Sequence, residues 1–293
     1  GCMAQRYKNE IIEEVPEVDA VLGTTSYGDI LKAIREAMEG KHFQEFKDID
    51  YLPEKLGKRV LTTGGHFGYL KIAEGCDKHC TYCIIPKLRG KFRSVPMERL
   101  VTQAKEMAEE GVKELILVAQ ETTVYGTDIY GKKSLHILLK ELCKIKGIRW
   151  IRVLYCYPEE IYDELIQTMK EEKKICHYLD LPIQHASDRI LKRMGRRTTQ
   201  AELVEIVNKL RREIPDIVLR TTLISGFPGE TQEDHEELMS FVDEMEFDRL
   251  GVFTYSPEED TPAATMPDQV AEEVKEARRD EIMELQQEIS YDK

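Results

Sequence analysis

The sequence lacks any apolar run near the roughly 20 residues that a membrane-spanning helix needs, and it does not begin with a signal-peptide pattern. Positive charge is scarce relative to negative, with 42 Lys and Arg against 55 Asp and Glu and a formal net charge of −13. These absences argue against a membrane partner and against a surface that wraps nucleic acid. Seven cysteines are an odd number for a long chain, which favours a reducing compartment over a disulfide framework. We therefore predict a cytoplasmic protein.

The chain is long enough for one large domain and a smaller one, since it has 293 residues, of which 41% are hydrophobic. Its first part predicts a helix over residues 4–14, a short strand over 18–23, and a helix whose apolar face carries Ile30, Leu31, Ile34 and Met38. Residues 41–68 carry charges, prolines and glycines without periodicity, which is linker composition. We place the domain boundary at residues 57–58, and expect residues 1–57 to be a fragment of a small α/β domain.

From residue 69 onward, apolar strands alternate with amphipathic helices. Continuous apolar runs of this kind are typical of parallel strands covered on both faces. The predicted strands are residues 69–73, 115–119, 148–154, 178–183, 217–224 and 249–254. Helices are expected after them, with Pro96 in the first turn of one, Ser134 capping the next, and Thr199 and Glu202 forming a capping box further on.

Six β/α units in strict alternation predict a parallel sheet that curls toward a barrel. Six units are too few for the closed eight-unit barrel. The predicted fold class is therefore α/β, an open, partial TIM-like barrel of six β/α units over residues 58–270. The final helix, over residues 270–289, carries a thin apolar face of Val274, Ala277, Ile282, Leu285 and Ile289. In open α/β sheets the chemistry is expected at the carboxyl ends of the strands.

Three cysteines, Cys76, Cys80 and Cys83, follow the first of these strands within eight residues. Three thiolates from one loop indicate a metal site, and their odd number leaves room for a fourth ligand that is not a cysteine. Structural zinc normally has four protein ligands, and the nearest further candidate is His79. The residues alone leave zinc and an iron–sulfur cluster with one open iron as alternatives. The distant Cys143, Cys156 and Cys176 are expected to be inert core thiols.

This pattern of cysteines, with an aromatic residue (Tyr82) before the last one and six β/α units around it, resembles the signature of the radical S-adenosylmethionine (SAM) superfamily. The resemblance implies that Cys76, Cys80 and Cys83 hold a [4Fe–4S] cluster whose fourth iron is chelated by SAM. One electron from the cluster then cleaves the sulfonium and yields a radical that abstracts hydrogen from carbon.

The same resemblance implies contacts to SAM from residues at the strand ends. For some of these the residues alone also allow a solvated turn, a buried salt bridge or a satisfied core histidine at His185. The implied cofactor-binding residues are Tyr82, Gln120, Glu121, Thr122, Gln184, Arg220, Ser225 and Gly226.

Residues 180–187, 190–194 and 220–230 are similar to the methylthiotransferases, and residues 120–126, 255–257 and 266–270 are most similar to the RimO branch of that family. The likeness implies an enzyme that attaches a methylthio group to the β-carbon of an aspartyl residue in small-subunit ribosomal protein twelve. It also implies that residues 1–57 end an N-terminal domain holding an auxiliary [4Fe–4S] cluster, and that residues 271–293 lead to a TRAM domain. Cys2 would be one ligand of that auxiliary cluster; its two companion cysteines and the TRAM domain are absent from this sequence.

The resemblance further implies two clusters in the full-length protein, a basic ribosomal loop as substrate, an electron donor such as a flavodoxin or ferredoxin, and a monomer. Two alternatives stay open. A MiaB-like transfer-RNA adenosine methylthiotransferase would use a basic surface, which Lys87, Arg89, Lys91 and Arg93 allow. A non-enzymatic interaction module stabilised by a metal would show no dependence on SAM.

Overall fold

The computed structural model describes residues 1–52 and 60–293, and the chain divides into two compact units. Unit 1 comprises Gly1–Thr62, Glu74–Lys78 and Ile84–Arg93; unit 2 comprises Thr63–Ala73, His79–Cys83 and Ser94–Lys293. The boundary predicted at residues 57–58 falls in 53–59, outside the described residues. No helix in the described part of the chain combines the length and apolarity that crossing a membrane requires.

The described residues of unit 1 form a parallel strand pair and four short helices. Strand β1 pairs with β2, with Ala20 opposite Phe43. Its elements are α1 (Cys2–Glu14), β1 (Ala20–Leu22), η1 (Tyr27–Asp29), α2 (Ile30–Met38), β2 (Phe43–Glu45) and α3 (Ile85–Arg89). The prediction that residues 41–68 are only a linker is wrong at β2, because a strand of three residues is too short to show alternation and forms by pairing with β1.

The apolar face predicted for α2 is exposed. Ile30, Leu31, Ile34 and Met38 all lie on the surface, and Ala33 is the buried residue of this helix. A sheet of two three-residue strands gives a nine-residue helix little area to pack on. Helical periodicity therefore predicted the helix correctly, but the burial of its face wrongly.

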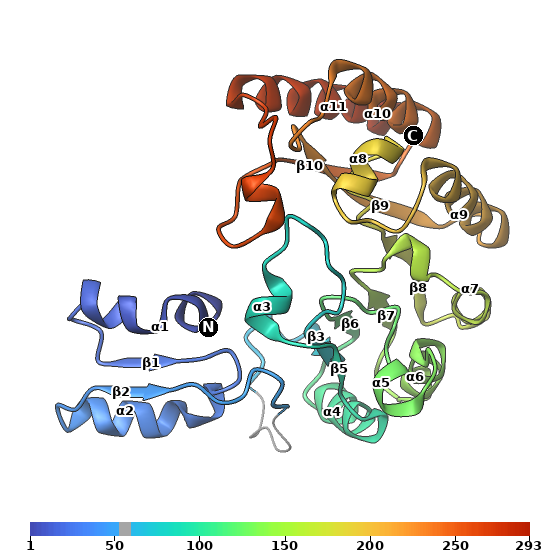
Figure 1. Cartoon of the computed structure of the whole chain (residues 1–293). Helices are drawn as coiled ribbons and strands as arrows, with labels where there is room; N and C mark the ends of the chain where they lie inside the picture. The colour runs from blue at the N-terminus through green and yellow to red at the C-terminus, as the bar shows by residue number, and fades with distance from the viewer. Residues whose placement is uncertain (53–59) are drawn as a thin grey trace. The chain divides into compact units, whose positions relative to one another are not determined.

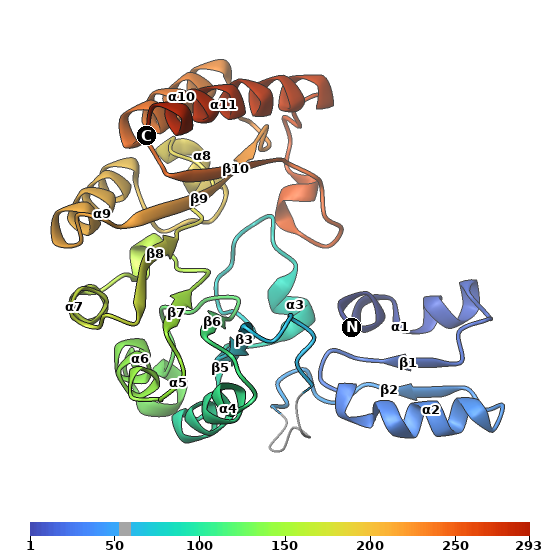
Figure 2. The same cartoon turned by 180° about the vertical axis from the view of Figure 1, so that it is seen from behind.

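Unit 2 is built on a six-stranded parallel sheet in which each strand lies beside its neighbours in the sequence. The strands are β3 (Phe67–Lys71), β6 (Glu114–Val118), β7 (Trp150–Val153), β8 (Ile175–Asp180), β9 (Val218–Ser225) and β10 (Arg249–Thr254). Between β3 and β10 the sheet curves with its helices on the outer side (Figure 1), and the view from behind shows the same arrangement (Figure 2). Among the described strands β3 and β10 do not pair, so the barrel is open and partial, as predicted.

Burial alternates along these strands. In β6, Leu115 and Leu117 are fully buried, whereas Ile116 and Val118 are half-buried. Strand β9 shows the same alternation from Leu219 to Ser225. The strands were expected to be covered on both faces, but one set of side chains is only partly covered. An open barrel leaves its inner face accessible, and the site is expected there.

The helices of unit 2 follow the strands. They are α4 (Met97–Glu109), α5 (Thr127–Tyr130), α6 (Leu135–Cys143), η2 (Pro158–Glu160), α7 (Asp163–Glu171), α8 (Asp188–Arg193), α9 (Gln200–Glu213), α10 (Gln232–Met245), η3 (Pro262–Thr265) and α11 (Glu272–Asp292). The short strands β4 (Ala73–Glu74) and β5 (Arg93–Ser94) pair with each other. The capping box of Thr199 with Glu202 is confirmed at α9. Ser134 precedes α6 but does not cap it, because its hydroxyl donates to the Lys132 carbonyl at 3.0 Å.

Helix α11 buries Ile282 and Ile289 of the predicted face and half-buries Leu285, but the rest of its buried face differs from the prediction. Val274 and Ala277 are exposed, while three polar side chains, Lys275, Arg278 and Gln286, are buried. Each donates to a backbone carbonyl of unit 2: Lys275 to Tyr255 at 2.8 Å, Arg278 to Glu230 at 3.2 Å and Gln286 to Phe247 at 2.8 Å. A buried polar group costs little when it is hydrogen-bonded. The face is therefore partly polar, and apolar residues alone could not predict it.

Candidate functional site

In unit 2, residues His79–Cys83 of the cysteine loop are held against the end of α8. The N–H of Thr81 donates to the Met194 carbonyl at 2.9 Å, and its hydroxyl donates to the Arg193 carbonyl at 2.8 Å. Gly195 follows with φ of +73°, and a Cβ there would lie 2.8 Å from the His79 carbonyl oxygen. This close approach requires glycine. Cys80 and Cys83 are thus carried on a backbone fixed by hydrogen bonds, with Cys80 buried and Cys83 half-buried.

In unit 1, Cys76 lies in a tight backbone turn. Its N–H donates to the Gly90 carbonyl at 3.2 Å, and its Sγ accepts from the N–H of Lys78 at 3.4 Å. Gly75 before it has φ of +80°, and a Cβ on it would clash with the backbone of Lys91. A sulfur that accepts a backbone N–H is stabilised as a thiolate.

The donor set fits an iron–sulfur cluster. Cys76, Cys80 and Cys83 are free thiols, and Cys76 and Cys80 are buried. Within the described ranges, no three His, Cys, Asp or Glu side chains group around a point where one metal ion would sit. Cysteine thiolates are the usual ligands of iron–sulfur clusters, so the chemistry of the three donors suits such a cluster.

Tyr82, between the last two cysteines of the loop, packs into an apolar cluster. Its ring lies edge-on to Phe227 with centroids 6.4 Å apart, next to Ile190 and Tyr255. Burial raises the pKa of Tyr82 well above its usual value, and the neighbouring Cys80 acts in the same direction. The phenol is therefore neutral, and its ring joins the loop to the segment after β9.

Glu121 and Thr122 follow β6, and their buried side chains face the end of β7. The Thr122 hydroxyl donates to the carbonyls of Leu154 at 2.8 Å and Tyr155 at 3.0 Å. A Glu121 carboxylate oxygen accepts from the N–H of Thr123 at 3.1 Å and of Tyr157 at 3.5 Å. These contacts join the carboxyl ends of two neighbouring strands. Gln120, before them, is half-buried.

The carboxyl end of β8 carries Gln184, and Arg220 lies on β9. Gln184 has φ of +74° and bridges to Leu223, with its N–H donating to the Thr222 carbonyl at 2.9 Å. Arg220 forms an ion pair with the buried Asp180 at 2.6 Å, and its side chain is 39% exposed. The guanidinium thus keeps an accessible side on the inner face of the sheet.

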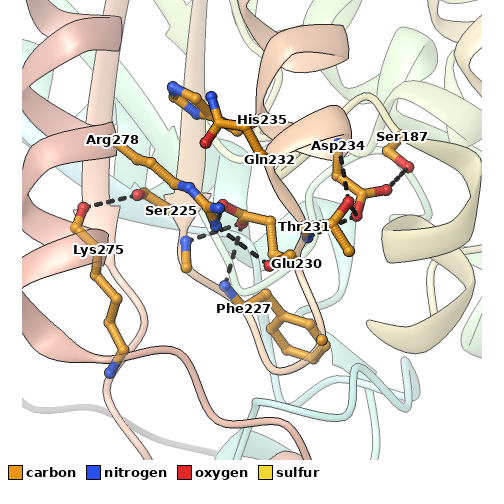
Figure 3. A network of polar contacts seen from close by, with 12 residues as sticks. Ser187, Ser225, Phe227, Glu230, Thr231, Gln232, Asp234, His235, Lys275 and Arg278 are labelled. Carbon is orange, nitrogen blue, oxygen red and sulfur yellow. Dashed lines mark hydrogen bonds and ion pairs between the residues drawn. The ribbon is translucent and has the colours of Figure 1, made fainter.

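Ser225, the last residue of β9, belongs to a polar network (Figure 3) that also fixes the next residue, Gly226. The Glu230 carboxylate accepts from the N–H groups of Gly226 at 2.8 Å and Phe227 at 3.2 Å, and pairs with Arg278 of α11 at 2.9 Å. The Ser225 hydroxyl donates to the Lys275 carbonyl at 2.9 Å. This network determines the backbone shape of the segment predicted to contact SAM.

A buried histidine completes the environment of Glu230. Nδ1 of His185 accepts the N–H of Ser187 at 3.0 Å, so the proton of a neutral ring is on Nε2, which lies 3.5 Å from the Glu230 carboxylate. Burial alone would raise the pKa of Glu230, but His185, Arg278 and the N–H of Phe227 outweigh it and the pKa is lowered. The carboxylate therefore remains charged, and His185 is a buried histidine beside it.

Asp234, at the start of α10, forms a second and unpredicted capping box with Thr231. Its carboxylate also accepts from Ser187 at 2.7 Å and pairs with Arg189. Burial acts to raise its pKa, but these hydrogen bonds dominate and lower the pKa to about 2. Asp234 therefore joins α10 to the start of α8.

This low pKa predicts a pH dependence of stability. Because the folded pKa lies below the unfolded value near 3.8, the contribution of Asp234 is complete above pH 4 and is lost as pH falls toward 2. Urea unfolding of the wild type and of Asp234→Asn should show a difference in free energy at pH 6 that shrinks across this window. A difference of constant size from pH 6 to pH 2 would contradict the assignment.

The remaining cysteines behave as core thiols. Burial raises the pKa of Cys143 to about 12, and it also raises the pKa of Cys156 and Cys176. Cys156 is fully buried, 3.4 Å from the Thr122 hydroxyl. Protonated thiols of this kind are poor metal ligands.

Cys2, the predicted auxiliary ligand, lies in unit 1 beside α3. Nε of Arg89 donates to its Sγ at 3.1 Å, and Arg89 also pairs with Glu74 at 3.5 Å.

Sequence reasoning missed several residues that the structure places around the site. Tyr157 and Arg196 lie beside Cys80, and Glu230 and Arg278 fix the segment after β9. Only Tyr157 had a usable signal, because it is a polar aromatic residue directly after a predicted strand. The others act through contacts distant in the sequence.

Known proteins share this architecture. The family model described as the radical SAM superfamily matches residues 70–242, more than half of the chain. Coproporphyrinogen III oxidase (HemN) from Escherichia coli shares the fold, with a TM-score of 0.56 at 18% identity over 76% of this chain and 53% of that one. The family match assigns the chain to the radical SAM superfamily.

Two curated relatives show which family within the superfamily the chain resembles. The chain is 66% identical, over 100% of its length and 67% of the relative, to the ribosomal protein uS12 methylthiotransferase RimO of Lachnoclostridium phytofermentans. It is 56% identical to the protein of the same name from Clostridium perfringens, over 99% of this chain and 65% of the relative. The chain thus spans about two thirds of the length of these relatives. It belongs to the RimO-type methylthiotransferase family of the radical SAM superfamily.

Proposed function

We propose that this chain is the radical SAM part of an enzyme that transfers a methylthio group to the β-carbon of an aspartyl residue of ribosomal protein uS12. The observation that carries the proposal is the 66% identity over the whole chain to a relative named for that activity. Two features of the chain support it: the three-cysteine loop follows β3 and the Gly226 segment follows β9, and ligands of open α/β sheets bind at the carboxyl ends of the strands.

Cys76, Cys80 and Cys83 would hold a [4Fe–4S] cluster with one iron open to SAM. When bound, the cluster supplies the electron that cleaves SAM and starts hydrogen abstraction. The chain's own residues would bind SAM and orient it. Ser225 and Gly226 would contact SAM from a backbone that Glu230 holds in shape, and the apolar cluster around Tyr82 excludes water from one side of the loop.

The remaining contacts to SAM are proposed from the positions of the residues in the sheet. Gln120, Glu121, Thr122 and Gln184 follow the carboxyl ends of β6 and β8. Arg220 lies in the first half of β9 and pairs with Asp180 at the carboxyl end of β8. The accessible side of Arg220 suits an anionic group, because a guanidinium binds carboxylates in two-pronged geometry.

We also propose that Cys2 binds an auxiliary [4Fe–4S] cluster in the full-length enzyme, where Arg89 donates a hydrogen bond to its sulfur. This adds a second cluster to the one held by the cysteine loop. The proposed electron donor is a flavodoxin or ferredoxin, and the proposed state is a cytoplasmic monomer.

The substrate decides between the protein-directed enzyme and its relatives that modify transfer RNA. We expect full-length enzyme, reconstituted without oxygen and supplied with SAM and reductant, to add a methylthio group to uS12 and to leave adenosine of transfer RNA unmodified. Mass spectrometry of both products measures this. A modified transfer RNA with unmodified uS12 would favour the other enzyme class, and a colourless zinc protein inert to SAM would favour the metal-stabilised module.

A further inference from the structure

A phenol hydroxyl lies beside one of the three cysteines of the loop. The Oη of Tyr157 is 3.6 Å from the Sγ of Cys80, within hydrogen-bond reach of a sulfur. A cysteine that binds iron does so as a thiolate and carries no proton. In the loaded protein the tyrosine is therefore the donor and the sulfur the acceptor.

Contacts on both sides of the residue fix Tyr157 in place. The N–H of Tyr157 also donates to Glu121 at 3.5 Å, and the one-turn helix η2 begins at Pro158. Both ends of the residue are thus fixed where β7 ends.

Arg196 stacks on the ring of Tyr157. Its guanidinium lies 4.2 Å from the ring centroid, a cation–π contact in a site where its side chain is 1% exposed. It pairs with Glu159 at 3.3 Å and donates to the Pro182 carbonyl at 3.2 Å. Because Gly195 brings the end of α8 against His79, Arg196 is fixed beside the cysteine loop.

The Arg196 guanidinium pairs with Glu159 but leaves two of its nitrogens without partners. Its Nε and Nη1 are buried, and neither has a hydrogen-bond partner among the residues that the structure describes. A buried cation of this kind is stabilised by negative charge close by. A thiolate-bound cluster would supply such negative charge.

We propose that Tyr157, positioned by Arg196, donates a hydrogen bond to the Cys80 thiolate and thereby raises the reduction potential of the cluster. The proposal rests on the proposed function, since it requires the cluster. Reduction adds negative charge to the cluster, and hydrogen bonds to its sulfurs stabilise that charge. This hydrogen bond would make the cluster easier to reduce without occupying the iron that is left open.

The test compares wild type with Tyr157→Phe, which removes the hydroxyl and keeps the ring on which Arg196 stacks. Redox titration followed by electron paramagnetic resonance, on full-length protein with measured iron content, gives the potential of the cluster. At the wild-type midpoint we expect about a tenfold smaller ratio of reduced to oxidised cluster in the variant, equivalent to about 59 mV for one electron. Tyr162→Phe is the matched control, because it removes a half-buried hydroxyl that contacts His136 instead. Its potential should equal that of the wild type.

Arg196→Lys supplies a second, independent variant. It keeps a positive charge but loses the planar group that stacks on Tyr157. The potential should therefore fall, though less than in Tyr157→Phe. Equal potentials for wild type and Tyr157→Phe, at equal iron content, would overturn the proposal. If Tyr157→Phe fails to take up iron, Arg196→Lys decides: a wild-type potential overturns the proposal and a lower one supports it. Absence of iron from the wild type itself would instead reject the proposed function.

Discussion

Replacing Cys80 with alanine is expected to leave the protein without its cluster and unable to cleave SAM. Cys76, Cys80 and Cys83 are the only thiols in the loop, and removing one leaves two ligands for a cluster that needs three and keeps its fourth iron for SAM. We expect the iron content of the loop site and the yield of 5′-deoxyadenosine after reduction to fall to background. Colorimetric iron analysis and chromatography of the products measure the two quantities.

The matched control is Cys143→Ala. Burial keeps the Cys143 thiol protonated, with its pKa raised to about 12, and it lies in α6 away from the cysteine loop. This variant should retain both iron and SAM cleavage at wild-type levels. Retention of both by Cys80→Ala would remove Cys80 from the ligand set and with it the assignment of the loop.

Much of the architecture could be predicted because its signals are local. Each of the six strands is a short apolar run between polar turns, and the order of a parallel β/α chain follows from its connections. The predicted ends moved by one to three residues in most strands, as at β8, expected at residues 178–183 and found at Ile175–Asp180. The cysteine loop was visible for the same reason, since its spacing is contained in eight residues.

Burial was harder to predict than secondary structure. In α11 the buried positions include Lys275, Arg278 and Gln286, which a pattern of apolar residues assigns to the surface. They are buried because each finds a backbone carbonyl at the end of a strand or helix, and such a partner is a property of the tertiary structure. In α2 the opposite occurs: apolar side chains are exposed, because no wide sheet covers that face of the helix.

Some side chains around the site could be predicted from local sequence signals, and others could not. Thr122 and Gly226 follow strands and could be chosen from the sequence, but their partners come from distant segments. Tyr157 reaches Cys80 across 77 positions of the chain, and Arg278 reaches Glu230 across 48. A single sequence contains no local signal for such pairs, which explains why the positioning residues were missed and the loop was not.

Loss of the Arg278 guanidinium is expected to cause the largest loss of stability among substitutions outside the cysteine loop. In Arg278→Met the Glu230 carboxylate keeps its two backbone N–H donors and His185 but loses its cation, in a site where both side chains are almost fully buried. Removing one partner of a buried ion pair typically costs about 3–5 kcal/mol. Guanidinium chloride unfolding followed by circular dichroism should show this loss.

The neighbouring Arg279 provides the matched control on the same helix. Its guanidinium is 36% exposed and pairs with the exposed Asp280, so Arg279→Met should change the unfolding free energy by about 0–1 kcal/mol. The double variant Glu230→Gln with Arg278→Met separates charge from packing. If the cost of Arg278→Met comes from an uncompensated carboxylate, neutralising Glu230 should recover part of it. A double variant as unstable as the sum of the two single ones would contradict that origin.

The same variant links the last helix to the site. Glu230 holds the N–H groups of Gly226 and Phe227, and Ser225 donates to α11 itself, so a disturbed carboxylate changes the backbone that would contact SAM. We therefore expect Arg278→Met to weaken SAM binding, measured by isothermal titration calorimetry under conditions where the variant remains folded, while its iron content stays at the wild-type level. Arg279→Met should alter neither quantity. Unchanged SAM affinity in a destabilised Arg278→Met would show that α11 supports the fold without shaping the site.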